Sequence, residues 1–199
     1  MLEDYRRYPI GIQNFEQLRN NNCVYVDKTE LVYRLTHTDQ VYFLSRPRRF
    51  GKSLLVSTLE AYFQGKKDLF RGLAMERLEQ DWESYPVLHI DFSISKYLSA
   101  HYLRSAINWF LERWEREYGC CVEDKKGTPF SVRLGNVIES AYKKTGKAVV
   151  VLVDEYDSPM LDTNSDVALQ GELRGIMRDF FSPLKGMGQY LGSADISGW

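Results

Sequence analysis

The chain has 199 residues, with 26 lysines and arginines, 27 aspartates and glutamates, and a formal net charge of -1. Apolar residues make up 44% of it, so a chain of this length can bury a large core without disulfide bonds. The near-neutral charge argues against a protein that coats nucleic acid or a membrane, because such proteins usually carry a clear basic excess.

The sequence lacks the patterns of membrane insertion and secretion. No apolar run approaches the roughly 18 residues of a membrane-spanning helix, and the first residues do not have the basic-then-apolar order of a secretory signal. We therefore expect a cytoplasmic protein without membrane contact. The three cysteines, Cys23, Cys120 and Cys121, are too few for a disulfide framework or a zinc site, so we expect reduced thiols and no metal except magnesium brought by a nucleotide.

The first forty residues are the least regular part of the chain. Residues 8–12 indicate an extended entry, and the Asp27-x-x-Glu30 spacing is typical of a helix start. Residues 41–44 form a short continuous apolar run, which predicts a strand buried on both faces. A helix follows at once, because four side chains share one helical face: Leu55, Leu59, Tyr62 and Phe63.

The middle of the chain contains two further strands. Residues 86–91 form one, and residues 148–153 are the most β-prone run in the protein. Between them, apolar spacing predicts amphipathic helices over residues 103–118 and 130–141. The second of these helices has a cap and a first-turn proline in Thr128-Pro129.

A last helix carries apolar residues on one face over residues 169–181 and stops near Ser182 and Pro183. Strands separated by long helical stretches require crossover connections. The pattern therefore predicts an α/β fold with a mainly parallel sheet and helices on its faces.

The segment between the strand at 41–44 and its helix contains Gly51-Lys52-Ser53. At a helix N-terminus these residues offer free backbone N–H groups and the positive end of the helix dipole to a phosphate. Lys52 would reach the terminal phosphates and Ser53 would ligate magnesium. The usual pattern has a glycine five residues before Gly51, where this chain has Arg46.

A second loop, Asp154-Glu155, follows the strand at 148–153. Asp154 would hold magnesium through a water, and Glu155 would polarise the water that attacks the γ-phosphorus. Both loops follow their strands at the carboxyl end of a parallel sheet, where ligands bind in such folds. The alternative is that Gly51-Lys52-Ser53 is only a capped turn and Asp154-Glu155 only a solvated strand end.

Arg46, Arg48 and Arg49 lie close to Lys52, so four cations occur in seven residues. They form either a solvated charge run or a group in which one arginine offsets phosphate charge, in this chain or at a neighbouring subunit. A further alternative is weak nucleic-acid binding through this cluster, which lacks an interleaved aromatic platform. Asp91, at the end of the strand at 86–91, is another candidate for the site.

Taken together, these residues resemble the AAA-ATPase-like family of bacterial proteins, in which an ATPase domain usually precedes a PD-(D/E)XK-type nuclease domain. The resemblance covers residues ~5 to ~191, and the family shares the arginine at the position of Arg46. Five segments carry it: Gly11-Ile12 with Phe15 and Leu18, Tyr25 to Thr29, Arg46 to Ser53, His89 to Ser93, and Asp154 to Asp157.

The resemblance implies a P-loop NTPase with a three-layer sandwich that binds ATP and Mg²⁺ and hydrolyses ATP. It assigns catalysis to Lys52 and Glu155, and metal binding to Ser53 and Asp154. The nucleotide would contact seven residues: Arg48, Arg49, Phe50, Gly51, Lys52, Ser53 and Leu54.

We divide the chain into residues 1–40, which we expect to pack near the nucleotide, and an ATPase core at 41–199. In relatives, the segment corresponding to residues 184–191 leads into an apolar strand with a polar sensor residue. Here only residues 192–199 follow, so we expect a chain truncated before that strand, in which ATP binding is more certain than turnover. A nucleotide-responsive interaction module without catalysis is the alternative.

Overall fold

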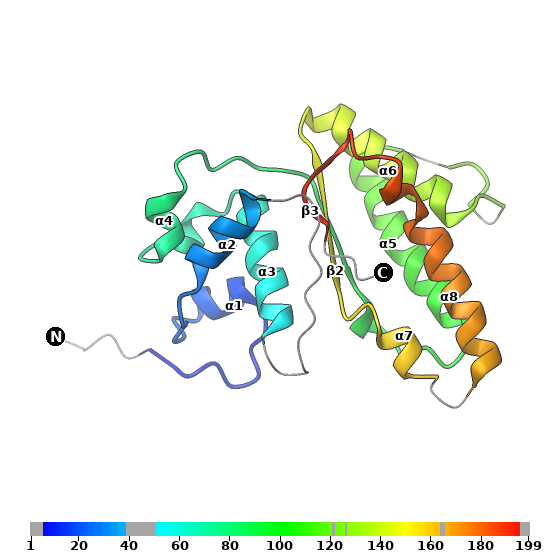
Figure 1. Ribbon diagram of the computed structural model, residues 1–199, viewed down its shortest axis with the longest axis horizontal. Coiled ribbons are helices and arrows are strands. Elements are labelled where there is room, and N and C mark those ends of the chain that lie inside the picture. The colour runs from blue at the N-terminus through cyan, green and yellow to red at the C-terminus, as the bar shows by residue number, and fades with distance from the viewer. Residues whose placement is uncertain (1–5, 39–50, 121, 126, 164–165, 196–199) are drawn as a thin grey trace.

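The computed structural model describes residues 6–38, 51–120, 122–125, 127–163 and 166–195 (Figure 1). Its α-helices are α1 (Phe15–Asn20), α2 (Thr29–Thr36), α3 (Lys52–Phe63), α4 (Ala74–Leu78), α5 (Ala100–Tyr118), α6 (Phe130–Thr145), α7 (Ser158–Leu161) and α8 (Val167–Phe181). The 3-10 helices are η1 (Lys67–Phe70), η2 (Phe92–Ile94) and η3 (Ser182–Lys185). The strands are β1 (Val87–Asp91), β2 (Val149–Asp154) and β3 (Leu191–Asp195).

The three strands form one parallel sheet in the order β1-β2-β3. β1 and β2 pair without interruption, from Val87 opposite Val150 to Asp91 opposite Asp154. The β2–β3 pairing starts with Val149 opposite Leu191 and is irregular in register. The prediction of a parallel α/β sheet is confirmed for these strands, whereas the predicted strand at 41–44 lies outside the described residues.

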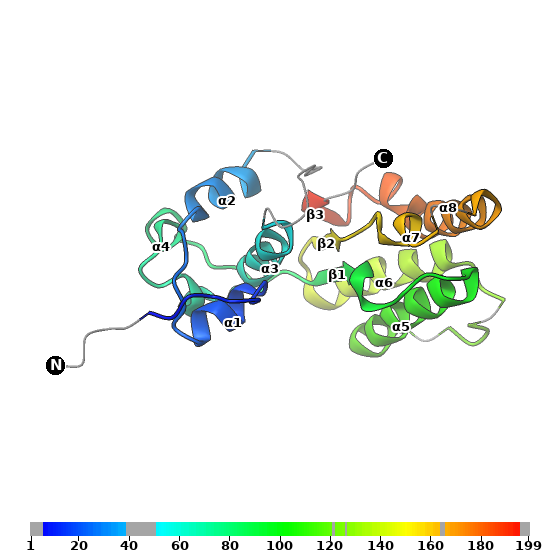
Figure 2. The ribbon, with the colours of Figure 1, turned by 90° about the horizontal axis from the view of Figure 1, so that it is seen from below.

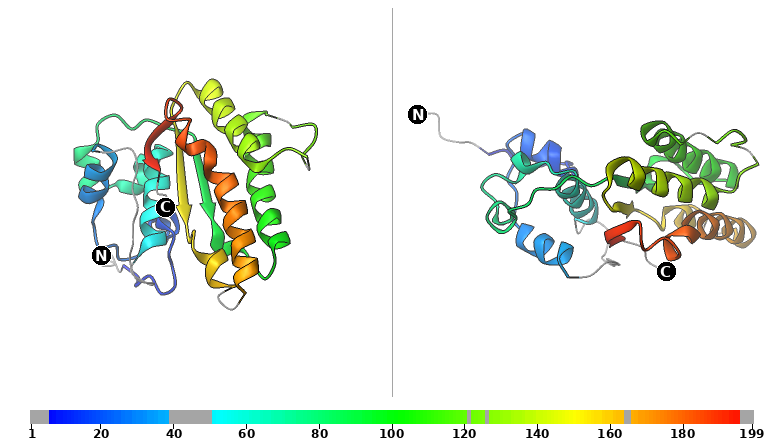
Figure 3. Two further views of the ribbon diagram at one scale, coloured as in Figure 1. Left: turned by 45° about the vertical axis from the view of Figure 1, so that its right-hand side comes forward. Right: turned by 90° about the horizontal axis from the view of Figure 1, so that it is seen from above.

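Helices pack against both faces of the sheet, as Figures 2 and 3 show. Alternate residues of a strand point to opposite faces, so β1 and β2 each contribute to two separate apolar clusters. One cluster joins Leu88, Ile90, Val149, Val151 and Val153 to apolar side chains of α5, α6 and α8. The other joins Val87, Val150 and Leu152 to side chains of α1, α2, α3, α4 and η1.

The Tyr25–Thr29 segment ties two helices of the N-terminal half together. Asp27 Oδ1 accepts hydrogen bonds from Thr29 N and Thr29 Oγ1, and its Oδ2 accepts one from Ala74 N at 2.7 Å. Thr29 Oγ1 accepts a further bond from Met75 N. The start of α2 is thereby joined to the start of α4, which gives this part of the resemblance a structural role.

A buried ion pair joins α5 to α6. Arg133 has no exposed surface, and its Nε and Nη2 donate to the two carboxylate oxygens of Glu115 at 2.7 and 3.0 Å. Arg133 Nη1 also donates to Asn108 Oδ1. This two-point geometry satisfies both charges where water cannot reach them.

Three expectations need correction. Pro129, predicted as a first-turn residue, is the N-cap of α6, so the cap lies one residue later than predicted. Thr128 Oγ1 donates to Asp124 O and does not cap the helix. Helix α1 was not predicted, because it has only six residues and its signal is the Asn14 side chain that accepts from Gln17 N. The segment expected to leave the sheet without its next strand forms β3, since the free edge of β2 offers backbone partners at Leu191–Asp195.

The described helices also bear on membrane insertion. None of them combines the length and the apolar character needed to cross a membrane.

Candidate functional site

The first turn of α3 begins at a glycine N-cap. Gly51 caps the helix in the left-handed conformation, with φ at +75°, and no side chain caps the helix there. Its carbonyl accepts the first helical bond from Leu55 N at 3.0 Å. The N–H groups of Lys52, Ser53 and Leu54 precede that bond and lie where a helix leaves its donors without partners.

Helix α3 runs antiparallel to β1. Tyr85 N, just before β1, donates to Phe63 O at the last residue of α3, and His89 Nδ1 lies 2.9 Å from Glu60 Oε2. The N-terminus of α3 therefore lies toward the carboxyl end of the sheet, at the lower edge of the molecule in Figure 1.

The rise per residue of helices and strands gives the position of the α3 N-terminus relative to the end of β1. Lys52 precedes Glu60 by eight residues, about 12 Å along a helix. Asp91 follows His89 by two residues, about 7 Å along a strand. By this estimate the α3 N-terminus lies about 5 Å beyond the end of β1.

The acidic strand ends face α3. Val150 and Leu152 belong to the cluster on the α3 side, so Asp154 points to the same face of β2 by strand alternation. Asp91 lies directly opposite Asp154 and shares the face of Val87 and His89. The structure therefore brings Lys52, Asp91 and Asp154 to one end and one face of the sheet.

Asp154 is a buried carboxylate at the end of β2. It is 6% exposed, and among the described residues Glu155 N donates a hydrogen bond to its Oδ1 at 3.0 Å. A buried ionised carboxylate is costly unless cations or donors surround it. Its remaining lone pairs fit a hard cation such as Mg²⁺, which prefers oxygen ligands.

Glu155 occupies a strained backbone conformation. Its φ is +50°, which is uncommon for a residue other than glycine. Its carbonyl accepts from Ser158 N at 2.9 Å, so the chain turns sharply from β2 into α7. Strain of this kind persists only where surrounding contacts maintain it, and it is concentrated at functional sites.

The remaining predicted residues divide into two groups. Gly51, Lys52, Ser53 and Leu54 are in place at the start of α3, with Lys52 and Ser53 half-buried. Arg46, Arg48, Arg49 and Phe50 lie outside the described residues, so their predicted contacts with a nucleotide stay predictions.

The His89–Glu60 pair lies deeper on the same face. Burial acts to raise the pKa of the Glu60 carboxyl, but the hydrogen bond and the charge of His89 outweigh it and lower the pKa. The pair joins β1 to the middle of α3, and thus connects the strand that ends in Asp91 to the helix that begins with Lys52.

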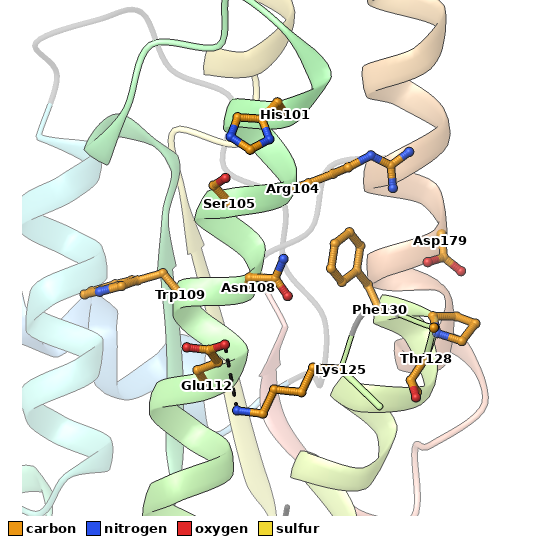
Figure 4. A pocket seen from close by; sticks show the side chains of 12 residues that line it. His101, Arg104, Ser105, Asn108, Trp109, Glu112, Lys125, Thr128, Phe130 and Asp179 are labelled. Atoms are coloured by element: carbon orange, nitrogen blue, oxygen red, sulfur yellow. Dashed lines mark ion pairs between the residues drawn. The ribbon is translucent and has the colours of Figure 1, made fainter. Parts of the chain in front are cut away.

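A cavity of about 780 Å³ lies elsewhere, between α5, the segment before α6 and α8 (Figure 4). Its charged groups face one another: Lys125 Nζ lies 3.7 Å from Glu112 Oε1, and Asp179 accepts from Ser131. None of the described site residues lines it. This cavity is therefore separate from the candidate site at the carboxyl end of the sheet.

One contact near the site has no signal in the sequence. Asp162 Oδ2 accepts from Tyr97 N at 3.0 Å, which ties the segment after β2 to the segment after β1. The two residues are 65 positions apart, and neither belongs to a motif.

Comparison with known proteins identifies the family of the chain. A family model described as "Predicted AAA-ATPase" matches residues 9–198. The chain is 37% identical over 195 residues to the "Uncharacterized protein in vnfD 5'region" of Azotobacter chroococcum mcd 1. That match covers 97% of this chain but 37% of the relative, so the chain spans well under half of the relative's length. No solved structure matches. With its family match extending over nearly its whole length, the chain belongs to the predicted AAA-ATPase family.

Proposed function

We propose that this chain is a P-loop ATPase domain with a three-layer sandwich, which binds ATP with Mg²⁺ and hydrolyses the β–γ phosphate bond. The observation that carries the proposal is the convergence of the α3 N-terminus with the Asp154-Glu155 turn at the carboxyl end of one parallel sheet. Helices on both faces of that sheet support the three-layer assignment.

The first turn of α3 supplies the phosphate contacts. Its first N–H groups bind phosphate oxygens, and the Lys52 ammonium neutralises the terminal phosphates. We propose that Arg48, Arg49, Phe50 and Leu54 complete the nucleotide contacts.

The Asp154-Glu155 turn, called the acidic turn below, supplies the groups for hydrolysis. Ser53 and Asp154 would hold Mg²⁺, which would withdraw charge from the β- and γ-phosphates. Glu155 accepts a hydrogen bond from the attacking water and takes its proton, and its strained backbone fixes where that carboxylate points. Asp91, opposite Asp154, adds a second acidic group to this edge.

We also propose that the N-terminal segment borders the nucleotide. Phe15 N donates to Ser57 Oγ at 2.9 Å, and Ser57 lies five residues after Lys52 on α3. The chain before α1 therefore passes beside the first turns of α3, where the base of a bound nucleotide would extend.

Phosphate release at saturating ATP, with and without Mg²⁺, tests the proposal. We expect Glu155→Gln to abolish release while ATP binding, followed by tryptophan fluorescence, is retained. We expect Lys52→Ala to lose both. A Lys52→Ala variant with wild-type release would refute the phosphate-loop assignment, and a wild-type chain that binds ATP without release would identify a nucleotide-responsive module without catalysis.

A further inference from the structure

The segments that leave β1 and β2 are tied together at one carboxylate. Asp162, directly after α7, accepts a hydrogen bond from the backbone N–H of Tyr97 at 3.0 Å. Its other oxygen lies 3.4 Å from the ammonium of Lys96. The Tyr97 side chain is fully buried and the Asp162 side chain is 18% exposed, whereas that of Lys96 is 82% exposed.

A short series of hydrogen bonds connects Asp162 to Glu155. Asp162 N donates to Ser158 O at 3.1 Å, and Ser158 N donates to Glu155 O at 2.9 Å. Glu155 N in turn donates to Asp154 Oδ1 at 3.0 Å. Helix α7 is therefore a single-turn link between the Asp162 anchor and the acidic turn.

The backbone conformation of Glu155 requires contacts that hold it in place. Glu155 has a positive φ, and a strained residue keeps its conformation only when neighbouring contacts over-determine it. Helix α7 has four residues and is too short to be stable alone. Asp162 holds one end of it. Gln170 Nε2 and Thr163 Oγ1 each donate to Met160 O at 3.3 Å, and Pro159 is buried.

We propose that Asp162 is a positioning residue, which fixes α7 through the backbone of Tyr97 and thereby sets the orientation of the Glu155 carboxylate toward the attacking water. This inference rests on the proposed ATPase function. The hydrogen bond to Tyr97 N, and not the ion pair with Lys96, carries the effect, because an exposed ion pair contributes little.

Three variants separate these contributions. Asp162→Ala removes the acceptor, Asp162→Asn keeps an acceptor for Tyr97 N but removes the charge, and Lys96→Met removes only the ion pair. Because Gln170 still holds Met160, we expect all three variants to fold, and circular dichroism would verify this.

Steady-state ATPase kinetics and amide hydrogen exchange by NMR provide the two readouts. For Asp162→Ala we expect kcat to fall at least about tenfold with the dissociation constant for ATP changed less than about threefold. We expect the Glu155 and Ser158 amides to exchange at least about tenfold faster, while the amides of β2 are unchanged. Asp162→Asn and Lys96→Met should stay within about twofold of the wild type in both readouts.

The outcomes distinguish the two proposals. A wild-type chain without phosphate release would refute the ATPase function, and the exchange rates would still decide whether Asp162 holds the acidic turn. Unchanged exchange at Glu155 and Ser158 in Asp162→Ala would overturn the positioning role, as would faster exchange with a wild-type kcat. If kcat fell as much in Asp162→Asn and Lys96→Met as in Asp162→Ala, the effect could not be assigned to the Tyr97 hydrogen bond.

Discussion

Replacing Arg133 by methionine should destabilise the protein strongly. The substitution keeps most of the side-chain volume but leaves the Glu115 carboxylate, which is 2% exposed, without its two-point partner. Breaking a buried pair by removing one member costs about 3–5 kcal/mol. Lys125 Nζ lies 3.6 Å from Glu115 Oε2 and offsets part of this, so we expect about 3 kcal/mol.

Urea unfolding followed by tryptophan fluorescence would measure the loss. With an m-value of about 2 kcal/mol/M, the midpoint should fall by about 1.5 M without a change in slope. The double variant Arg133→Met/Glu115→Leu is the matched control, because it removes both charges. We expect it to lie within about 1 kcal/mol of the wild type.

The reasoning would be refuted by either of two results. One is an Arg133→Met midpoint within error of the wild type, which would mean that the carboxylate finds water or another partner. The other is a double variant that is less stable than Arg133→Met, since the pair would then contribute more than its isolated charges cost.

Three further predictions concern the site and the N-terminal half. Gly51→Ala should lower the free energy of unfolding by about 1–2 kcal/mol and weaken ATP binding. Gly119→Ala, at the same φ of +75° and likewise with no described atom within 4 Å of the added Cβ, should lower only the stability; equal ATP affinity in the two variants would contradict the phosphate contact. Glu155→Gly should abolish phosphate release without lowering the thermal midpoint, because glycine adopts a positive φ freely; a lower midpoint would argue against strain at this residue. Burial acts to raise the pKa of Asp27, but hydrogen bonds from Thr29 and Ala74 outweigh it and lower the pKa. The stability difference between wild type and Asp27→Asn should therefore be full above about pH 4 and shrink as the pH falls further. A difference that is constant across this range would disprove the lowered pKa of Asp27.

Much of the fold could be predicted because its elements bury one regular face. The apolar spacing of α5, α6 and α8 and the unbroken apolar run of β2 follow from burial against the sheet. Helix α1 gave no comparable pattern, since it buries only Phe15 and Leu18. Strand β3 contains Gly192 and Ser193, and its extended form depends on the pairing partner that β2 provides.

The candidate site likewise contains residues that the sequence predicts and residues that it does not. Gly51, Lys52 and Asp154 are predictable because each adjoins an element whose end the sequence marks. Asp162 is not, because its partner Tyr97 N is a backbone group brought near only by the folded chain. Short-range patterns therefore indicate the candidate groups, and long-range contacts determine what holds them in place.

The Asp27 carboxylate has a topological consequence. By bonding Ala74 N, it closes the chain between these residues into a loop of nearly fifty residues that contains Gly51 and all of α3. The entropy lost on closing a loop grows only slowly with its length, so a few hydrogen bonds can hold a loop of this size. We expect the enclosed segment to open as one cooperative unit, which hydrogen exchange would detect as a shared opening free energy for α2, α3 and η1. Nucleotide binding at the start of α3 would then protect the amides of helices that never touch the ligand.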